Sequence, residues 1–162
     1  MNRAARLIAT VGRVGLLRPA PGTWGSAAAL PLGWVAMQGG PLLFTLLTAA
    51  ILPLGWWATA HATRGQADHD PSEIVIDEVL GQWIALLPLA WGAANAGVAV
   101  ERLWPGWVAA FALFRLFDIW KPGPVGWMDR RSDAFGVMAD DVVAGAMAAG
   151  GVLALAGAFH AL

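Results

Sequence analysis

The 162-residue sequence contains no cysteine and no tyrosine, and charged residues make up only 13% of it. Without cysteine, the chain cannot form disulfides, bind a metal through thiolates or use a cysteine nucleophile. Charged residues usually make up about a quarter of a soluble protein, and hydrophobic residues here reach 58%. The composition therefore indicates a protein embedded in a membrane, where lipid contacts the outer faces.

The aromatic composition is also typical of a membrane protein. Tryptophan concentrates at the headgroup level of a bilayer, and the chain has ten tryptophans. Nine of them lie near the ends of hydrophobic runs: Trp34, Trp56, Trp57, Trp83, Trp91, Trp104, Trp107, Trp120 and Trp127. The formal net charge of −1 excludes the basic surface expected of a nucleic-acid-binding protein.

Five hydrophobic stretches predict membrane-embedded helices. They cover residues 24–38, 42–61, 79–98, 103–120 and 137–160. The first is short and contains Pro31, so we expect it to be tilted, kinked or only partly inserted. Arg13 and Arg18 make the N-terminus more typical of a short segment on the membrane surface than of a signal peptide. We predict one all-α, polytopic membrane domain over residues 1–162, with about four to five embedded helices.

The basic residues predict how these helices are oriented. Cytoplasmic loops of membrane proteins carry an excess of Lys and Arg. With five spans, eight of the nine loop cations fall on the side of the N-terminus, and Arg102 alone falls on the other. The N-terminus is therefore predicted to be cytoplasmic and the C-terminus external.

Ten of the eleven acidic residues fall on that same side. Five of them have hydrophobic flanks at the ends of three spans: Asp77, Glu78, Asp118, Asp140 and Asp141. A charge at the centre of a span costs on the order of 3 kcal/mol, and less near the interface. Converging carboxylates would also repel one another, so they need either a bound cation or ion pairs. The basic residues available for ion pairs are Arg115, Lys121, Arg130 and Arg131.

A divalent metal site is the interpretation that we favour. Oxygen ligands without cysteine or clustered histidine select Mg²⁺ or Mn²⁺ over zinc. Arg115, Asp118 and Lys121 follow one another at intervals of three, so a helix places them on one face. A metal polarises phosphoryl oxygens and activates a water, while Arg and Lys stabilise the charge that develops. The combination therefore suits phosphate chemistry.

Two helix starts on this side present further groups. Glu73 and Asp77 share a face if their helix begins near Pro71. Within residues 15–30, proline and glycine keep the chain irregular until Thr23–Ser26 open a helix, whose free N–H groups and hydroxyls can hold an anion. Many helices begin with such a turn without binding anything. Its position beside the acids is what makes it of interest.

Four sequence blocks resemble those of one enzyme family. They are GLLRPAPGTWGS at 15–26, IVIDEVLGQW at 74–83, FRLFDIWKPGPV at 114–125 and GVMADDVVAGAMAA at 136–149. Together, and in this order, they resemble the phosphatidylglycerophosphatase A family. The resemblance implies a Mg²⁺-dependent lipid phosphatase of the bacterial inner membrane. Such an enzyme converts the phospholipid phosphatidylglycerophosphate to phosphatidylglycerol and inorganic phosphate.

The resemblance also implies roles for individual residues. The metal ligands are expected to be Asp77, Glu78, Asp118, Asp140 and Asp141. The base that takes a proton from the water is expected among the same acids except Asp118, which is either a ligand or a residue that orients one. The phosphate is expected to be held by Thr23, Gly25, Ser26, Arg115 and Lys121. Catalysis is expected to depend on Asp77, Glu78, Asp118, Arg115 and Lys121. In the loop expected before Asp140, Ala134 and Phe135 replace family glycines, which leaves that loop's flexibility and substrate contact open.

The mechanism is narrowed by motifs that the sequence lacks. It has no cysteine for a phosphocysteine, no D-x-D-x-T/V motif, and no histidine in an Arg-rich context. A metal-activated water attacking phosphorus directly is the preferred mechanism, and a transient phospho-Asp stays open. His61, at the cytoplasmic end of the second span, is either an interfacial residue or a member of the site.

Other functions would distribute the acids differently. A polytopic transporter, or a cation-binding membrane protein without hydrolytic activity, would need them near the bilayer midplane and along a path. A transferase of the CDP-alcohol type also uses Mg²⁺ and Asp clusters, but its DG…AR…G…D…D pattern does not occur in the sequence. Collection of the acids at one interface favours the phosphatase.

Overall fold

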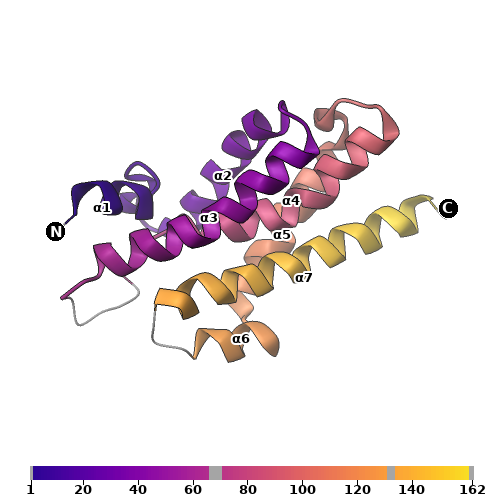
Figure 1. Cartoon of the computed structure of the whole chain (residues 1–162). Coiled ribbons are helices and arrows are strands. Elements are labelled where there is room, and N and C mark those ends of the chain that lie inside the picture. The colour runs from indigo at the N-terminus through magenta and orange to yellow at the C-terminus, as the bar shows by residue number, and fades with distance from the viewer. Residues whose placement is uncertain (1, 66–70, 131–133, 161–162) are drawn as a thin grey trace.

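The chain folds into helices throughout the part that the structure, a computed structural model, describes, which is residues 2–65, 71–130 and 134–160. Within these ranges there is no strand, so the predicted all-α fold is confirmed. The elements are α1 (Arg3–Ala9), η1 (Val14–Leu16), α2 (Pro21–Met37), α3 (Pro41–Ala62), α4 (Ile76–Ala96), η2 (Val100–Leu103), α5 (Trp104–Trp120), α6 (Pro124–Asp129) and α7 (Ala134–His160), shown in Figure 1.

Each hydrophobic stretch identified in the sequence forms one long helix. These helices are α2, α3, α4, α5 and α7, and their ends differ from the predicted ones by three residues at most. Among the described residues, α3, α4 and α7 are long and hydrophobic enough to cross a membrane, whereas α2 and α5 have only 17 residues each. Large hydrophobic side chains such as Val35, Leu42 and Val108 are exposed on the outer faces, as expected for contact with lipid.

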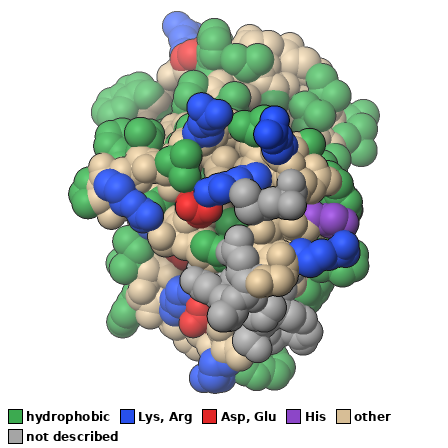
Figure 2. Space-filling model, turned by 90° about the vertical axis from the view of Figure 1, so that its left-hand side faces the viewer, with side chains coloured by type: hydrophobic (Ala, Val, Ile, Leu, Met, Phe, Trp, Pro, Cys, Tyr) green, Lys and Arg blue, Asp and Glu red, His purple; other side chains and the backbone are tan. Residues whose placement is uncertain are grey.

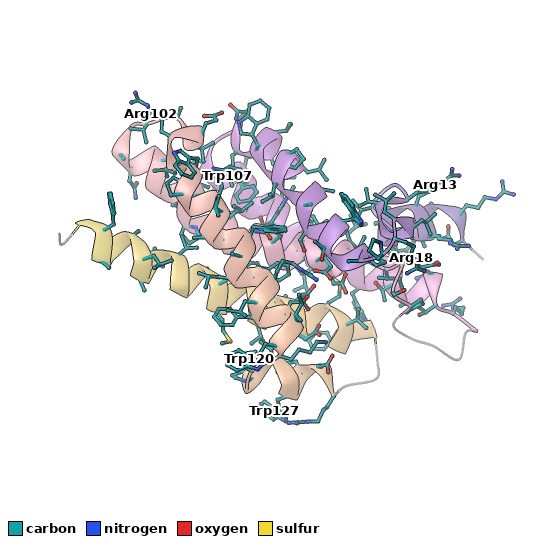
Figure 3. The ribbon with its side chains drawn as sticks, turned by 180° about the vertical axis from the view of Figure 1, so that it is seen from behind. Arg13, Arg18, Arg102, Trp107, Trp120 and Trp127 are labelled. Carbon is teal, nitrogen blue, oxygen red and sulfur yellow. The ribbon has the colours of Figure 1, made fainter. Side chains whose placement is uncertain are left out.

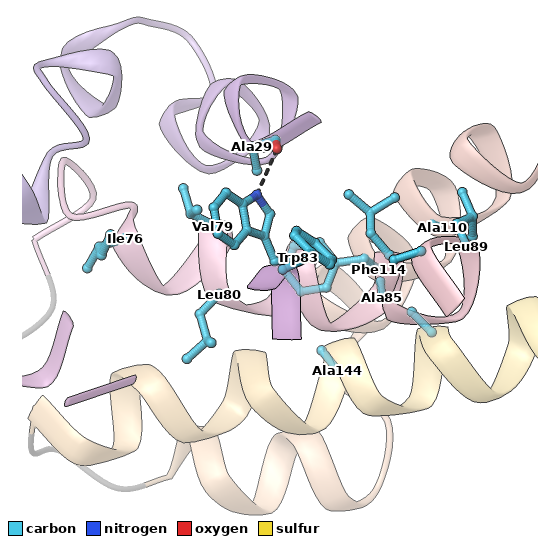
Figure 4. Close-up of a cluster of buried hydrophobic side chains, with 14 of the residues drawn as sticks. Ala29, Ile76, Val79, Leu80, Trp83, Ala85, Leu89, Ala110, Phe114 and Ala144 are labelled. Carbon is cyan, nitrogen blue, oxygen red and sulfur yellow. Dashed lines mark hydrogen bonds between the residues drawn. The ribbon is translucent and has the colours of Figure 1, made fainter. Parts of the chain in front are cut away.

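Helix α4 lies at the centre and packs against α2, α3, α5 and α7. Trp83 of α4 makes contacts with two of these helices, and Figure 4 shows its hydrogen bond to Ala29. Its Nε1 donates a hydrogen bond of 2.9 Å to the Ala29 carbonyl of α2, and its ring lies 5.1 Å from that of Phe44 in α3, centroid to centroid. A central position brings the first turn of α4 next to the ends of several other helices.

Two glycines allow α4 and α7 to approach closely. A Cβ added at Gly145 would lie 2.4 Å from the carbonyl oxygen of Gly81, and one added at Gly81 would lie 2.7 Å from that of Asp141. Both contacts are shorter than any real Cβ contact, so only glycine fits at this crossing, as is common between membrane helices. The crossing brings Asp141 beside the turn of α4 that carries Glu78.

The N-terminal segment of α1 and η1 packs over the bundle and determines where α4 begins. The Val75 N–H donates a 2.9 Å hydrogen bond to the Ala9 carbonyl, and Arg6 forms a 3.0 Å ion pair with Glu73. A helix start near Pro71, with Glu73 on the same face as Asp77, is therefore wrong. The residues before Ile76 form a turn instead, closed by a 2.8 Å hydrogen bond from the Ile74 N–H to the Pro71 carbonyl.

Five helix ends meet at one end of the bundle, because α2, α4 and α7 begin there and α3 and α5 end there (Figure 1). Arg13 and Arg18 lie toward this end and Arg102 lies at the other (Figure 3). Figure 2 shows Lys and Arg side chains spread over the first end, which we call the charged end, with hydrophobic side chains around its edges. That the charged end faces the cytoplasm stays a prediction.

Candidate active site

A cavity of about 300 Å³ opens at the charged end. It is bounded by the first turn of α2 and of α4, by the first two turns of α7 and by the last two turns of α5. All seven charged residues expected at the site line it: Asp77, Glu78, Asp118, Asp140, Asp141, Arg115 and Lys121. Residues that are far apart in the sequence therefore meet here, as the resemblance implied.

Three of the carboxylates form a tight cluster. One oxygen from each of Glu78, Asp118 and Asp141 lies within 4.8 Å of the other two. The three residues come from α4, α5 and α7, so the cluster exists only when these helices are packed together. Asp141 is buried, and the other two are partly buried. We call Glu78, Asp118 and Asp141 the carboxylate cluster.

Arg115 bridges two members of the carboxylate cluster. Its Nη1 lies 2.5 Å from Glu78 Oε2 and 2.7 Å from Asp118 Oδ2. The second pair joins residues three apart on α5, as their spacing predicted. The same nitrogen reaches the Ser26 hydroxyl of α2 at 3.4 Å. Arg115 thus connects α2, α4 and α5 at the cavity wall.

Lys121 pairs with other acids than the sequence spacing suggested. It caps the C-terminus of α5 with a φ of +48°, which is left-handed, so its side chain leaves the face that carries Asp118. Its Nζ bonds to Asp140 at 3.0 Å and also to Asp129. Burial on its own lowers the pKa of Lys121, but the hydrogen bonds to Asp129 and Asp140 outweigh it and raise that pKa. The amine is therefore charged at neutral pH.

The first turns of α2 support Glu78 from behind. A Cβ at Gly22 would lie 2.0 Å from Glu78 Oε1, and one at Gly25 would lie 2.8 Å from the Cβ of Val75. Ser26 is fully buried, and its hydroxyl lies 3.0 Å from both the Gly22 carbonyl and Glu78 Oε2.

The phosphate contacts expected from α2 are therefore divided. Thr23 lines the cavity, whereas Gly25 and Ser26 are buried against α4. Neither Gly25 nor Ser26 belongs to the described cavity lining, because the close packing of α2 on α4 turns them toward Glu78. That either residue contacts the phosphate stays a prediction. Gly22, which was not singled out in the sequence, does line the cavity.

The remaining two acids lie beside the carboxylate cluster. Asp77 Oδ1 accepts the Glu78 N–H at 2.9 Å, and Asp140 Oδ1 accepts the Asp141 N–H at 3.0 Å. Each acid thus bonds to the backbone of the cluster residue that follows it. The expectation that Ala134 and Phe135 lie in a loop before Asp140 is wrong, because α7 already begins at Ala134.

Two further expectations concern residues around the cavity. His61 Nδ1 donates a 2.8 Å hydrogen bond to the Trp57 carbonyl and does not belong to the described cavity lining, which supports the interfacial interpretation. Of the basic residues considered for ion pairs, Arg115 and Lys121 do form them. Arg130 is exposed just after α6, and Arg131 lies outside the described residues.

The carboxylate cluster fits a hard divalent cation. Its donors are oxygens, and the described cavity lining contains no histidine. Two oxygens on opposite sides of a Mg²⁺ would lie about 4.2 Å apart, from bond lengths of about 2.1 Å, which is compatible with a cluster held within 4.8 Å. Charge supports the same conclusion, because five carboxylates face two cations among the described lining residues.

One buried polar residue near the site was not singled out in the sequence. Gln82 lies one turn after Glu78 on α4 and is fully buried. Neither polar atom of its side chain has a hydrogen-bond partner among the described residues. An unpaired buried amide destabilises a protein by about 1–3 kcal/mol, so this residue calls for an explanation.

Comparisons with known proteins agree with the geometry. A family model described as phosphatidylglycerophosphatase A matches residues 7–156. The chain is 39% identical to the phosphatidylglycerophosphatase A of Haemophilus influenzae over 133 residues, which are 80% of this chain and 75% of the relative. It is 36% identical to the phosphatidylglycerophosphatase A of Escherichia coli over 153 residues, which are 93% of this chain and 82% of the relative.

A third relative carries a different name. The chain is 41% identical over 133 residues, 78% of this chain and 77% of the relative, to a Bacteroides thetaiotaomicron protein provisionally named a phosphatidylinositol-3-phosphatase. No solved structure matches the chain. The family match covers almost the whole chain, including every block from which the cavity is built. The chain belongs to the phosphatidylglycerophosphatase A family.

Proposed function

We propose that the chain is a Mg²⁺-dependent lipid phosphatase that hydrolyses phosphatidylglycerophosphate to phosphatidylglycerol and inorganic phosphate. Membership of the family and the names of two relatives support this activity. The observation that carries the proposal is the cavity in which the carboxylate cluster of three helices meets Arg115. The site is proposed to face the cytoplasm from the bacterial inner membrane.

The charge of the cavity makes a cation necessary for this function. A phosphate monoester is itself an anion, and five carboxylates surrounding two cations would repel it. A bound Mg²⁺ supplies positive charge to the phosphoryl oxygens and increases the acidity of a coordinated water. The residues proposed to hold it are Glu78, Asp118 and Asp141.

The basic residues of the cavity orient the phosphate. Arg115 presents several N–H donors in one plane, which suits the oxygens of a phosphate. Lys121 contributes charge and not a proton, because hydrogen bonds to Asp129 and Asp140 raise its pKa. Thr23 offers a hydroxyl at the first turn of α2, where helix N–H groups favour an anion.

Hydrolysis joins a water oxygen to phosphorus and breaks the bond between phosphorus and the glycerol oxygen. The proton lost by the water passes to a carboxylate and then to the departing glycerol oxygen. Asp77 and Asp140 are the candidates for this base, because both line the cavity outside the carboxylate cluster.

The position of the cavity suits a lipid substrate. Three hydrophobic side chains near the end of α5 and in α6 are each about two-thirds exposed: Ile119, Trp120 and Trp127. Figure 3 shows both tryptophans at the periphery of the molecule. Exposed tryptophans settle at the headgroup level of a bilayer, the depth at which the phosphate of a phospholipid lies.

The test is phosphate release by the detergent-purified protein from phosphatidylglycerophosphate, phosphatidylinositol 3-phosphate and glycerol 3-phosphate. We expect release chiefly from the first, loss of release with EDTA, and recovery on addition of Mg²⁺. Asp141→Asn should lower the rate at least about a hundredfold. The control Glu101→Gln changes an acid between α4 and α5, at the other end of the bundle, and should keep full activity.

Each alternative has its own outcome in this assay. Phosphate release that continues unchanged in EDTA would contradict the proposed metal dependence. Faster release from phosphatidylinositol 3-phosphate would favour the activity for which the Bacteroides relative is named, and release only from glycerol 3-phosphate would overturn the lipid assignment. No release from any substrate would support a cation-binding or transport protein instead.

A further inference from the structure

Two polar groups beside the cavity are buried without a hydrogen-bond partner among the described residues. One is the side-chain amide of Gln82, and the other is the Nε of Arg115. Gln82 is 0% exposed. Its amide could pair with a donor or an acceptor, and the guanidinium Nε–H is a donor. The two unpaired groups are therefore complementary.

Packing of the neighbouring residues shows where Gln82 projects. Gly81 lies against α5, since a Cβ added there would be 2.3 Å from the ring of Phe114. Trp83 lies against α2, where it bonds to the carbonyl of Ala29. Successive residues of a helix are about 100° apart, so Gln82 projects between these two directions. Glu78, one turn earlier on the same face of α4, contacts Ser26 of α2 and Arg115 of α5, so Gln82 faces the seam between α2 and α5.

Arg115 crosses the same seam. From α5, its Nη1 reaches Glu78 of α4 at 2.5 Å and Ser26 of α2 at 3.4 Å. Glu78 lies four residues before Gln82, on the same face of α4. Side chains in a helix lean toward its N-terminus, so the amide of Gln82 leans toward the level of Glu78 and Arg115.

We propose that Gln82 is a positioning residue for Arg115. When the guanidinium turns from its carboxylate partners toward the substrate phosphate, Oε1 of Gln82 accepts a hydrogen bond from Nε of Arg115. This inference rests on the proposed function, because it requires a phosphate in the cavity. It assigns a purpose to an amide that otherwise only destabilises the bundle.

A change of partners at Arg115 is what makes such an acceptor useful. Here Nη1 is occupied by Glu78 and Asp118, and a phosphate has to compete with both for the same donors. When the Arg115 guanidinium leaves these carboxylates, it loses the contacts that fix the orientation of its plane. A buried acceptor on the opposite edge restores a fixed plane, so that two N–H groups can meet two phosphate oxygens.

The test compares Gln82→Met, which keeps the length of the side chain but removes both polar atoms, with Thr59→Val. The Thr59 hydroxyl is also buried and unpaired within the described chain, but it lies on α3 and outside the cavity lining. We measure thermal unfolding, kcat and KM, and the binding of inorganic phosphate by calorimetry with Mg²⁺ present. Gln82→Met should bind phosphate about tenfold more weakly without unfolding earlier. Thr59→Val should leave phosphate binding unchanged.

A double-variant cycle tests whether Gln82 acts through Arg115. Arg115→Lys keeps the charge but has no Nε, so Gln82→Met should have no further effect on phosphate affinity in that background. The proposal is overturned if Gln82→Met binds phosphate as tightly as the wild type does. It is also overturned if Gln82→Met lowers phosphate affinity as much in the Arg115→Lys background as in the wild type. If Gln82→Met unfolds early, Gln82→Asn keeps the amide but withdraws it by one methylene, and should show the same loss.

The wild type separates this inference from the proposed function. If it binds phosphate but does not hydrolyse the lipid, the proposed function fails, and phosphate affinity still decides the role of Gln82. If it binds no phosphate at all, both proposals fail.

Discussion

Gly22 is the residue whose missing side chain matters most to the cavity. Glu78 Oε1 occupies the place that a Cβ at this position would take, at 2.0 Å. The carboxylate is held there by Arg115 and Ser26, so it can move away only by giving up these contacts. The position of one member of the carboxylate cluster thus depends on a neighbour that carries no charge.

We expect Gly22→Ala to lower activity at least about tenfold while leaving the fold intact. Alanine favours a helix over glycine by about 1 kcal/mol, which offsets part of the strain, so the displaced Glu78 carboxylate should dominate the effect. Phosphate release and thermal unfolding are the measurements. The control is Gly157→Ala in α7, where a Cβ would meet nothing within 4 Å. Equal activity of the two variants would contradict this account.

At the scale of single residues, the charged residues that line the cavity could be predicted from the sequence. The uncharged residues Gly22 and Gln82, which pack beside them, could not. Asp77, Glu78 and Asp118 stand out because acids among hydrophobic residues are costly in a membrane. Gly22 and Gln82 carry no such signal, because their importance depends on atoms contributed by other helices. A glycine inside the PGT turn was the only hint in the sequence for the first of these two residues.

At the scale of elements, the crossing of α4 and α7 brings the carboxylate cluster together. Glu78 precedes Gly81 by one turn, and Asp141 precedes Gly145 by one turn. The contact between the two glycines therefore controls the distance between the two acids. Close backbone approach is needed because aspartate has a short side chain and α7 has to bring it within reach of α4 and α5.

Gly145→Ala should separate these two helices. The new Cβ would lie 2.4 Å from the Gly81 carbonyl, and overpacking of this kind usually costs about 1–3 kcal/mol. We expect earlier thermal unfolding in detergent together with a loss of Mg²⁺-dependent activity. Gly150→Ala is the matched control on the same helix, because a Cβ there meets nothing within 4 Å. Unchanged stability and activity of Gly145→Ala would show that the crossing tolerates a wider spacing.

The long helices could be predicted from the sequence because each forms one continuous hydrophobic run. The residues at which they begin could not. The start of α4 depends on the hydrogen bond from Val75 to Ala9, which joins segments that are distant in sequence. The short helix α6 (Pro124–Asp129) was not predicted, since six residues carry too little periodicity. Through Asp129 it also supplies a partner for Lys121 that the sequence spacing did not suggest.

At the scale of the whole molecule, the two ends of the bundle differ in charge. The five carboxylates and the two cations of the described cavity lining lie at the charged end, whereas Glu101 and Arg102 lie in η2, at the other end. Hydrogen bonding from Trp34 lowers the pKa of Glu101, so this acid stays ionised at neutral pH. The excess of cations near the charged end predicts that it faces the cytoplasm.

The absence of cysteine allows this orientation to be tested directly. Arg64→Cys, just after α3, and Arg102→Cys each introduce a single thiol into a chain that has none. In spheroplasts, we expect a membrane-impermeant maleimide to label Arg102→Cys at once and Arg64→Cys only after the membrane is permeabilised. The unsubstituted chain is the control and should not be labelled under either condition. The reverse pattern would place the cavity outside the cell.

The size of the cavity has a consequence for the kinetics of the proposed reaction. About 300 Å³ is at the lower end of pockets for drug-sized molecules, about 300–1,000 Å³, and leaves no room for two acyl chains. The acyl chains of the substrate therefore stay among the surrounding lipids while its headgroup reacts in the cavity. The rate should then follow the mole fraction of the substrate in the bilayer or micelle, and dilution with an inert lipid at constant total substrate should slow the reaction.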